Sequence, residues 1–273
     1  MLSAKARQLI QEYQNLPFNE LANVRCPYFN NATRRRRGEL RALVGKGTPR
    51  EIIEEAKIAS LQYHAGLFDK TGNCCLHNEH TGAQLTADDL RHFLIDRGIG
   101  IECSGFVSQI LRAHYLERNN YDIAKQFRLC PKYKFVRQLL CHLRPIENMS
   151  VETYADSCNT TVVGSETRGW NYQQIEPGDV IVLLTIAPFK HRNHIILITD
   201  REGARLEYIH ARAWKSEGRY GHGVAAGTIQ ITAPEKNLTA QVWNELGKTG
   251  PENETYQEAI NARTVEVRRV RIN

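Results

Sequence analysis

The chain has 273 residues, of which 41% are hydrophobic and 24% are charged, and its formal net charge is +6. These values are ordinary for a globular protein, and no low-complexity tract or transmembrane-length apolar run is present. The first residues lack the apolar region and cleavage site of a signal peptide. Seven cysteines, an odd number without regular spacing, favour a reducing compartment. We therefore expect a cytoplasmic protein, or one that is exported without a classical signal peptide.

The positive charge is concentrated near the amino terminus. Residues 1–50 carry ten Lys or Arg against three Glu, whereas the rest of the chain is close to neutral. Arg34 to Arg37 are the densest part of this charge, and no aromatic residues are interleaved with them. Such a run is more typical of a solvated turn than of a nucleic-acid site, so nucleic acid is not an expected partner. We predict a basic extension over residues 1–47 and a main domain over residues 48–273.

The first half of the chain predicts helices. Residues 2–14 have an amphipathic pattern. Thr48 to Glu51 combine a capping box with proline at the first helical position, and an apolar-rich helix is expected from there to Leu61. Residues 86–89 cap another helix that runs to about residue 97. Residues 121–143 look helical with a break at Pro131, and the polar residues 150–174 predict a loop.

Strand patterns dominate the second half. Residues 180–184, 195–199 and 206–210 are short apolar runs of strand length, and a hairpin-like connection containing Gly203 joins the last two. Residues 228–232 and 264–272 alternate like half-buried strands, and residues 251–263 predict a helix. Helices followed by a late antiparallel meander indicate the α+β class.

Cys103 stands at the predicted start of a helix. Two glycines precede it in an extended approach, and Phe106, Val107, Ile110 and Leu111 recur after it at helical spacing. The first backbone N–H groups of a helix lack partners and carry positive charge, which stabilises a thiolate more than a thiol. The sequence is therefore compatible with a nucleophile, and equally with a small residue that begins a core helix.

Two histidines are predicted to be neighbours on the sheet. His194 comes directly before residues 195–199, and His210 ends the next run, so a hairpin brings the two together. A cysteine, a base and an orienting group form the constellation of covalent catalysis. His191 is an alternative base in the preceding loop, and His222 lies in a glycine-rich segment that could line a substrate loop.

The order of these motifs resembles that of NlpC-like cell-wall cysteine peptidases. The resemblance rests on Cys-Ser-Gly-Phe at residue 103, Pro-Gly-Asp before a hydrophobic strand, a histidine opening the next strand, and Ile-His-Ala at residue 209. It covers about residues 98–211 and implies a papain-like fold that cleaves stem peptides of peptidoglycan. It also implies that Cys103 is the nucleophile, His194 the general base and His210 the orienting residue.

The resemblance further implies how substrate is bound. An acidic residue and a serine beside the nucleophile bind the free amino terminus of the substrate, and here they are Glu102 and Ser104. The acidic residue is usually aspartate, so Glu102 is one methylene longer. The tyrosine-containing, glycine-rich segment before the nucleophile is not recognisable, and Tyr63 is the candidate for its tyrosine. The expected partner is a peptide or muropeptide substrate.

Other functions remain open on the sequence. The same three residues suit an acyltransferase or an amidase, and the fold could also serve as an inactive binding module. A cluster of cysteines and histidines has the composition of a zinc site, but no second ligand pair follows at finger-like spacing, so we predict a polar loop and no metal or cofactor. The cluster comprises Cys74, Cys75, His77 and His80. The oligomeric state has no sequence signal.

Overall fold

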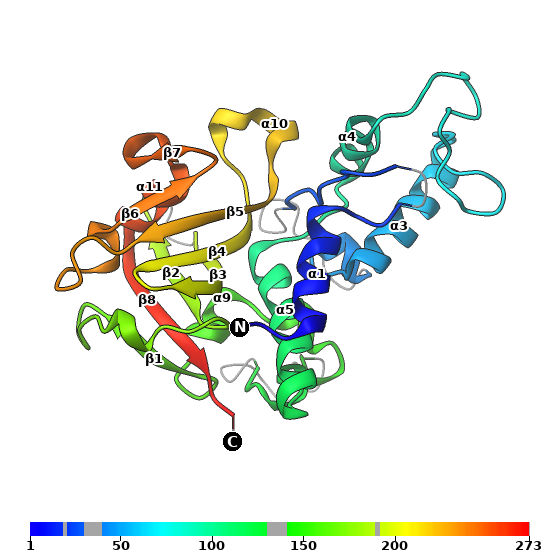
Figure 1. The fold of residues 1–273 in the computed structure, drawn as a ribbon. Coiled ribbons are helices and arrows are strands. Elements are labelled where there is room, and N and C mark those ends of the chain that lie inside the picture. Colours follow the sequence, from blue (N-terminus) through cyan, green and yellow to red (C-terminus); the bar gives the residue numbers. More distant parts are fainter. Residues whose placement is uncertain (19–20, 30–39, 130–140, 189–191, 273) are drawn as a thin grey trace. The chain divides into compact units, whose positions relative to one another are not determined.

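The computed structural model describes residues 1–18, 21–29, 40–129, 141–188 and 192–272. It combines helices with an antiparallel sheet, as the predicted α+β class requires. The chain forms two compact units (Figure 1). Unit 1 contains Met1–Ala6, Val107–His210 and Ala225–Asn273, and unit 2 contains Arg7–Phe106 and Ala211–Val224. The boundary expected between residues 47 and 48 stays a prediction.

Helices with well-defined starts form much of unit 2. Helix α3 (Pro49–Gln62) follows Thr48 and α4 (Ala87–Arg97) follows Thr86, and both predicted capping boxes are formed. Helix α1 (Ala4–Gln14) and the 3-10 helix η1 (Arg41–Val44) precede them. Tyr13 of α1 is buried and donates a 2.7 Å hydrogen bond to the carbonyl of Gly47. The described part of residues 7–47 thus belongs to unit 2.

Helix α5 (Cys103–Asn119) begins in unit 2 and continues into unit 1. Its start lies against Gly45, whose carbonyl accepts a 3.0 Å hydrogen bond from the Glu102 N–H. A Cβ atom on Gly105 would lie 2.2 Å from the same carbonyl oxygen, so only glycine fits there. The ring of Phe106 meets Tyr13 edge-on, with 5.2 Å between ring centroids. These contacts fix the first turn of α5 within unit 2.

The sheet of unit 1 has eight strands over the described residues, in the order β1-β8-β2-β3-β4-β5-β6-β7. The three predicted runs are β2 (Val180–Ile186), β3 (His194–Glu202) and β4 (Arg205–Arg212), and the meander continues through β5 (Gly223–Gln230), β6 (Val242–Glu245) and β7 (Lys248–Thr249). β8 (Ala262–Val270) returns to lie between β1 (Thr160–Ser165) and β2 (Figure 1). β4 and β5 each extend two residues into the 211–224 segment of unit 2.

One face of this sheet carries a hydrophobic core. Ile196 of β3, Tyr208 of β4 and Trp243 of β6 belong to it, together with Ala259 of helix α11 (Glu254–Ile260). Side chains two residues apart on a strand point to the same face. His194, His210 and Glu245 therefore share the face of the core, and α11 contributes to covering it.

Two local predictions were wrong. The loop predicted over residues 150–174 contains α9 (Val151–Ala155), β1 and the 3-10 helix η2 (Tyr172–Gln174). β1 is an edge strand that pairs with β8 and carries a register shift between Val162 and Gly164, so its apolar pattern is weak. The helix predicted over residues 251–263 is the shorter α11, because Asn253 caps it and the 3-10 helix η5 (Gly250–Glu252) precedes it.

Shorter elements complete the described chain. Within residues 121–143 the structure has α6 (Ile123–Gln126), while the break predicted at Pro131 lies outside the described residues. The others are α8 (Pro145–Asn148), α10 (Gly218–Gly221) and the 3-10 helices η3 (Lys215–Glu217) and η4 (Leu238–Ala240). In the described parts of the chain, no helix combines the length and apolarity needed to cross a membrane.

Candidate active site

Cys103 is the first residue of α5 and its exposed fraction is 7%. Other described cysteines are less suited to be nucleophiles. Burial raises the pKa of the Cys26 thiol far above its usual range, and partial burial beside two carboxylates raises that of Cys75. Cys141 is disulfide-bonded, and Cys158 is an exposed surface thiol. A disulfide is more typical of oxidising compartments, so the cytoplasmic location stays a prediction.

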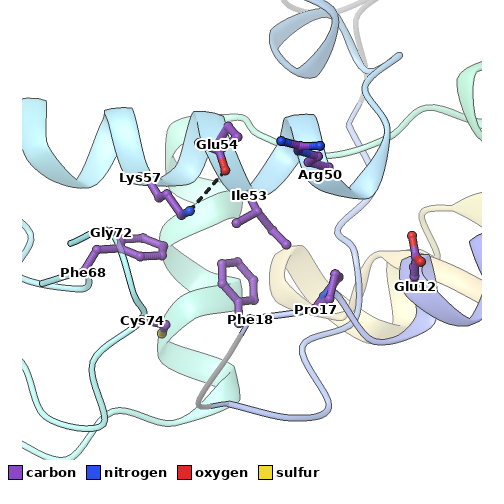
Figure 2. A pocket seen from close by; sticks show the side chains of 10 residues that line it. All are labelled: Glu12, Pro17, Phe18, Arg50, Ile53, Glu54, Lys57, Phe68, Gly72 and Cys74. Atoms are coloured by element: carbon purple, nitrogen blue, oxygen red, sulfur yellow. Dashed lines mark hydrogen bonds and ion pairs between the residues drawn. The ribbon is translucent and has the colours of Figure 1, made fainter.

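Cys74 lines a separate pocket of about 360 Å³ within unit 2 (Figure 2). Phe18 and Phe68 give this pocket an apolar side, and their ring centroids are 6.0 Å apart. Lys57 and Glu54 of α3 also line it and form a 3.1 Å ion pair. None of the described residues that line the pocket is a histidine, so the pocket offers no imidazole base for the Cys74 thiol.

The residues on either side of Cys103 hold an ammonium group from their own chain. The Nζ of Lys46 lies 2.5 Å from Oε1 of Glu102 and 2.7 Å from Oγ of Ser104. Ser104 also donates a 2.7 Å hydrogen bond to the same Glu102 oxygen. The Lys46 side chain is 4% exposed and that of Glu102 is 20% exposed. The two residues assigned to a substrate amine thus converge on a lysine.

In unit 1, the structure brings His194 and His210 together as the hairpin predicted. Nε2 of His194 lies 2.7 Å from Nδ1 of His210, and both side chains are buried. Nε2 of His210 lies 3.0 Å from Oε2 of Glu245, which is also buried. Tyr208 and Thr255 donate hydrogen bonds of 3.0 Å to the same carboxylate oxygen. The three residues therefore form a continuous buried chain from β3 through β4 to β6.

For imidazoles in the neutral form, this chain of hydrogen bonds determines which ring nitrogen carries the hydrogen. The Glu245 carboxylate accepts, so Nε2 of His210 carries the hydrogen and Nδ1 of His210 is an acceptor. Nε2–H of His194 then donates to that acceptor, which leaves Nδ1 of His194 unprotonated. An imidazole in this state can take a proton at Nδ1, and the imidazolium that results is stabilised by the carboxylate at the far end.

A second carboxylate lies beside the same histidine. Oε2 of Glu258, on α11, is 3.9 Å from Nδ1 of His194, and Glu258 also forms an ion pair with Arg192. Burial raises the pKa of Glu258 to about 7, with Glu245 adding to the increase and Arg192 opposing it. Glu258 therefore exchanges its proton near neutral pH, within reach of the histidine predicted to be the base.

Comparison with protein-family models, with curated proteins and with solved structures found no match.

The predicted hydrogen bond between Cys103 and His194 joins residues of different units and stays a prediction. His191, the alternative base, and Arg34 to Arg37 lie outside the described residues. Tyr63 is half exposed at the end of α3, where the guanidinium of Arg97 lies 3.6 Å from its ring centroid.

The other candidate residues from the sequence analysis make contacts of a structural kind. The ring Nε2 of His222 donates a 3.0 Å hydrogen bond to the Trp214 carbonyl, and Arg91 donates one to the His222 carbonyl. In the segment of Cys74, Cys75, His77 and His80, short β-bridges join Phe68 to Cys74 and His77 to Gln84. Among the described residues, no group of three or more His, Cys, Asp or Glu is arranged to hold a metal ion.

Three residues of these networks were not found from the sequence: Lys46, Glu245 and Glu258. Glu245 had no clear signal, because Val242, Trp243, Asn244 and Glu245 do not alternate between apolar and polar residues, although the structure places Glu245 on the buried face with Trp243. Lys46 and Glu258 have no sequence signal either. Lys46 lies between two glycines and Glu258 lies on a short helix, and both reach their partners through the tertiary fold.

Proposed function

We propose that the protein is a papain-like thiol hydrolase that cleaves peptide amide bonds, with Cys103 as nucleophile, His194 as general base and His210 as the orienting residue. The observation that supports this most is the buried hydrogen-bonded chain from His194 through His210 to Glu245. In this chain of hydrogen bonds, one ring nitrogen of His194 is available to accept a proton, and the opposite end of the chain is the Glu245 carboxylate. The position of Cys103 at the start of α5 supplies the electrostatic setting that a thiolate needs.

The proposed reaction has two stages. His194 Nδ1 takes the proton of the Cys103 thiol, and the thiolate attacks the carbonyl carbon of the substrate. The oxyanion is stabilised in part by the Cys103 backbone N–H at the positive end of α5. His194 then gives its proton to the leaving amine, and a thioester remains. Water, deprotonated by His194, attacks the thioester, which releases the acid and restores the thiol.

The resemblance of the motifs points to stem peptides of peptidoglycan, or to muropeptides derived from them, as substrates. This part of the proposal depends on the order Cys103, His194 and His210 and on the strands that carry the histidines. An acyltransferase would use the same residues and pass the acyl group to an amine or an alcohol, whereas an amidase would pass it to water and differ from a peptidase in the amine that it releases. An assay with and without an added amine or alcohol therefore identifies a transferase, and the identity of the released amine identifies an amidase.

The deciding experiment is a digest of peptidoglycan and purified muropeptides, analysed by mass spectrometry. We expect the wild-type protein to release new amino and carboxyl termini and Cys103→Ala to release none while unfolding at the same temperature. Cys74→Ala is the matched control, since that thiol lines a pocket without a histidine, and it should retain activity. Product that appears only with an added amine would indicate a transferase, and no product with any acceptor would leave a binding module.

Labelling of the thiols gives a test that needs no substrate. A brief, limiting pulse of iodoacetamide should modify Cys103 faster than Cys26, Cys74 or Cys75 in the folded protein. The measurement is made in a Cys158→Ser background, because Cys158 is exposed and would react whatever its role. An inert Cys103 beside a reactive Cys74 or Cys75 would contradict the assignment of the nucleophile.

A further inference from the structure

Glu102 and Ser104 form a receptor for one ammonium group. The carboxylate and the hydroxyl oxygen lie 2.5 Å and 2.7 Å from the same nitrogen, and they are hydrogen-bonded to each other. A carboxylate and a hydroxyl that converge in this way match the donors of an ammonium ion. The group that occupies the receptor is the side chain of Lys46, so the protein carries its own cation beside Cys103.

Lys46 is held there by its backbone as well as by its charge. Gly45 before it caps η1 in the left-handed conformation, with φ of 74°, and the Lys46 N–H donates a 2.8 Å hydrogen bond to the Arg41 carbonyl. The Gly45 carbonyl accepts from the Glu102 N–H, which ties this turn to the start of α5. Only 4% of the Lys46 side chain is exposed, so it is enclosed beside Glu102 and Ser104.

We propose that Lys46 is a specificity-determining residue, and that it restricts the enzyme to acyl groups without a free amine next to the cleaved bond. The inference rests on the proposed function, because it concerns the substrate of Cys103. A substrate ammonium ion would have to share one carboxylate with Lys46 and would be repelled by its positive charge. Peptides that continue in the amino-terminal direction, or that are acylated there, bring no second cation and are the class that fits.

The test compares one peptide in two forms, with a free amino terminus and with an acetylated one. For the wild-type protein we expect kcat/KM on the acetylated form to equal or exceed that on the free form. In Lys46→Met the Glu102 carboxylate loses its cation. The ratio of kcat/KM for the free form to kcat/KM for the acetylated form should therefore rise by about tenfold or more. The double variant Lys46→Met, Glu102→Gln should lose this preference, since no charge remains to attract an amine.

Lys57→Met is the matched control, because Lys57 belongs to the same unit and pairs with Glu54 on the exposed side of α3. This variant should leave the ratio of kcat/KM for the two substrates unchanged. A wild-type preference for the free amine of tenfold or more would overturn the proposal. So would a ratio in Lys46→Met equal to that of the wild type. If Lys46→Met does not fold, Lys46→Gln keeps hydrogen-bond donors at similar length and is tested in the same way.

A binding measurement separates this proposal from the proposed function. We expect n-butylammonium, but not n-butanol, to raise the unfolding temperature of Lys46→Ala. Neither compound should raise the unfolding temperature of the wild-type protein or of the double variant that combines Lys46→Ala with Glu102→Gln. If Lys46→Ala does not respond to n-butylammonium, the ammonium receptor is disproved whatever the enzymatic result. If the response is present but neither peptide is cleaved, the receptor stands, whereas the hydrolase and the substrate class that depends on it both fail.

Discussion

The carboxylate of Glu245 accepts hydrogen bonds of 3.0 Å from a histidine, a tyrosine and a threonine, all of them buried. The orientation of His210, and through it the tautomer of His194, depends on this one acceptor. Glu245 is therefore a positioning residue in the proposed mechanism and does not contact the substrate. Its replacement should alter the acid–base behaviour of His194 more than the binding of substrate.

We predict that Glu245→Gln lowers kcat/KM by roughly ten- to a hundredfold, since a neutral amide stabilises the imidazolium less than a carboxylate does. For the same reason, the acidic limb of the pH–rate profile should move to lower pH. Thr255→Val is the control, because it removes one donor and keeps the carboxylate, and it should change kcat/KM only a few-fold. A Glu245→Gln enzyme with an unshifted pH profile would assign Glu245 to structure alone.

Glu258 gives the folded protein a pH dependence of its own. Its pKa is about 7 in the folded protein, whereas its ordinary value is 4.5. Between these two values the folded state holds a proton that the unfolded chain has released. The free energy of unfolding therefore falls as the pH rises from about 4.5 to about 7. Above pH 7 both states are ionised and this contribution no longer changes.

We predict that Glu258→Gln removes this loss of stability, which is on the order of 2–3 kcal/mol. The measurement is urea unfolding of the wild type and the variant at pH 5 and pH 8, which span most of the window. Arg192, the ion-pair partner, is partly exposed and can be solvated in the variant. If the unfolding free energy changes between pH 5 and pH 8 by the same amount in both proteins, Glu258 is not the source of the pH dependence.

At the level of residues, the sequence was sufficient where partners are close along the chain. His194 and His210 are joined by one hairpin, so their contact follows from the strand pattern and the turn at Gly203. Glu245 lies 35 residues beyond His210, and Lys46 lies 58 residues before Ser104. Contacts at such separations depend on strand order and on a helix start, which no local pattern specifies.

Among the secondary-structure elements, the start of α5 is the one on which the proposed nucleophile depends. Gly105 allows the Gly45 carbonyl to approach the first turn, and that approach also brings Lys46 to Glu102 and Ser104. Two effects of a methyl group at this position oppose each other. Alanine has a higher helix propensity than glycine, by about 1 kcal/mol, but it would collide with the carbonyl oxygen.

We predict that the collision dominates, and that Gly105→Ala destabilises the protein by about 1–3 kcal/mol. The sign of the change in unfolding free energy decides the matter, because helix propensity alone predicts stabilisation. Ala113→Gly, farther along α5, calibrates the propensity term in the same helix. A Gly105→Ala variant as stable as the wild type would mean that Gly45 and Lys46 can move away from α5.

Elements with strong local signals were predicted well. The capping boxes at Thr48 and Thr86 define where α3 and α4 begin, and the apolar run of β2 is buried on both faces, as such a run indicates. β1 and α11 were missed or misjudged because their limits depend on tertiary contacts. β1 becomes a strand by pairing with β8, and α11 is shortened by the cap at Asn253.

For the whole molecule, β8 is an internal strand of the sheet, so its pairings contribute to the stability of two neighbouring strands. β8 pairs with β1 on one side and with β2 on the other, and both pairings are antiparallel. Val267 of β8 is part of the core, and Arg269 donates hydrogen bonds of 2.7 and 2.8 Å to the buried carboxylate of Asp179. Without β8, the apolar strand β2 would have an unpaired edge.

We predict that a chain ending at residue 261 is insoluble or lacks a cooperative unfolding transition. A chain ending at residue 271, which keeps all of β8, should unfold like the wild type. Solubility and circular dichroism during heating distinguish the two cases. A chain without β8 that retained the far-ultraviolet spectrum and the transition of the wild type would show that β1 and β2 do not need it.

The two compact units also have a consequence for how such a protein can evolve. The chain passes from one unit to the other after residues 6, 106, 210 and 224, so each unit is assembled from separate stretches. No single contiguous piece of the gene encodes either unit. Recombination that exchanges one continuous segment therefore cannot replace one unit whole without also replacing part of the other.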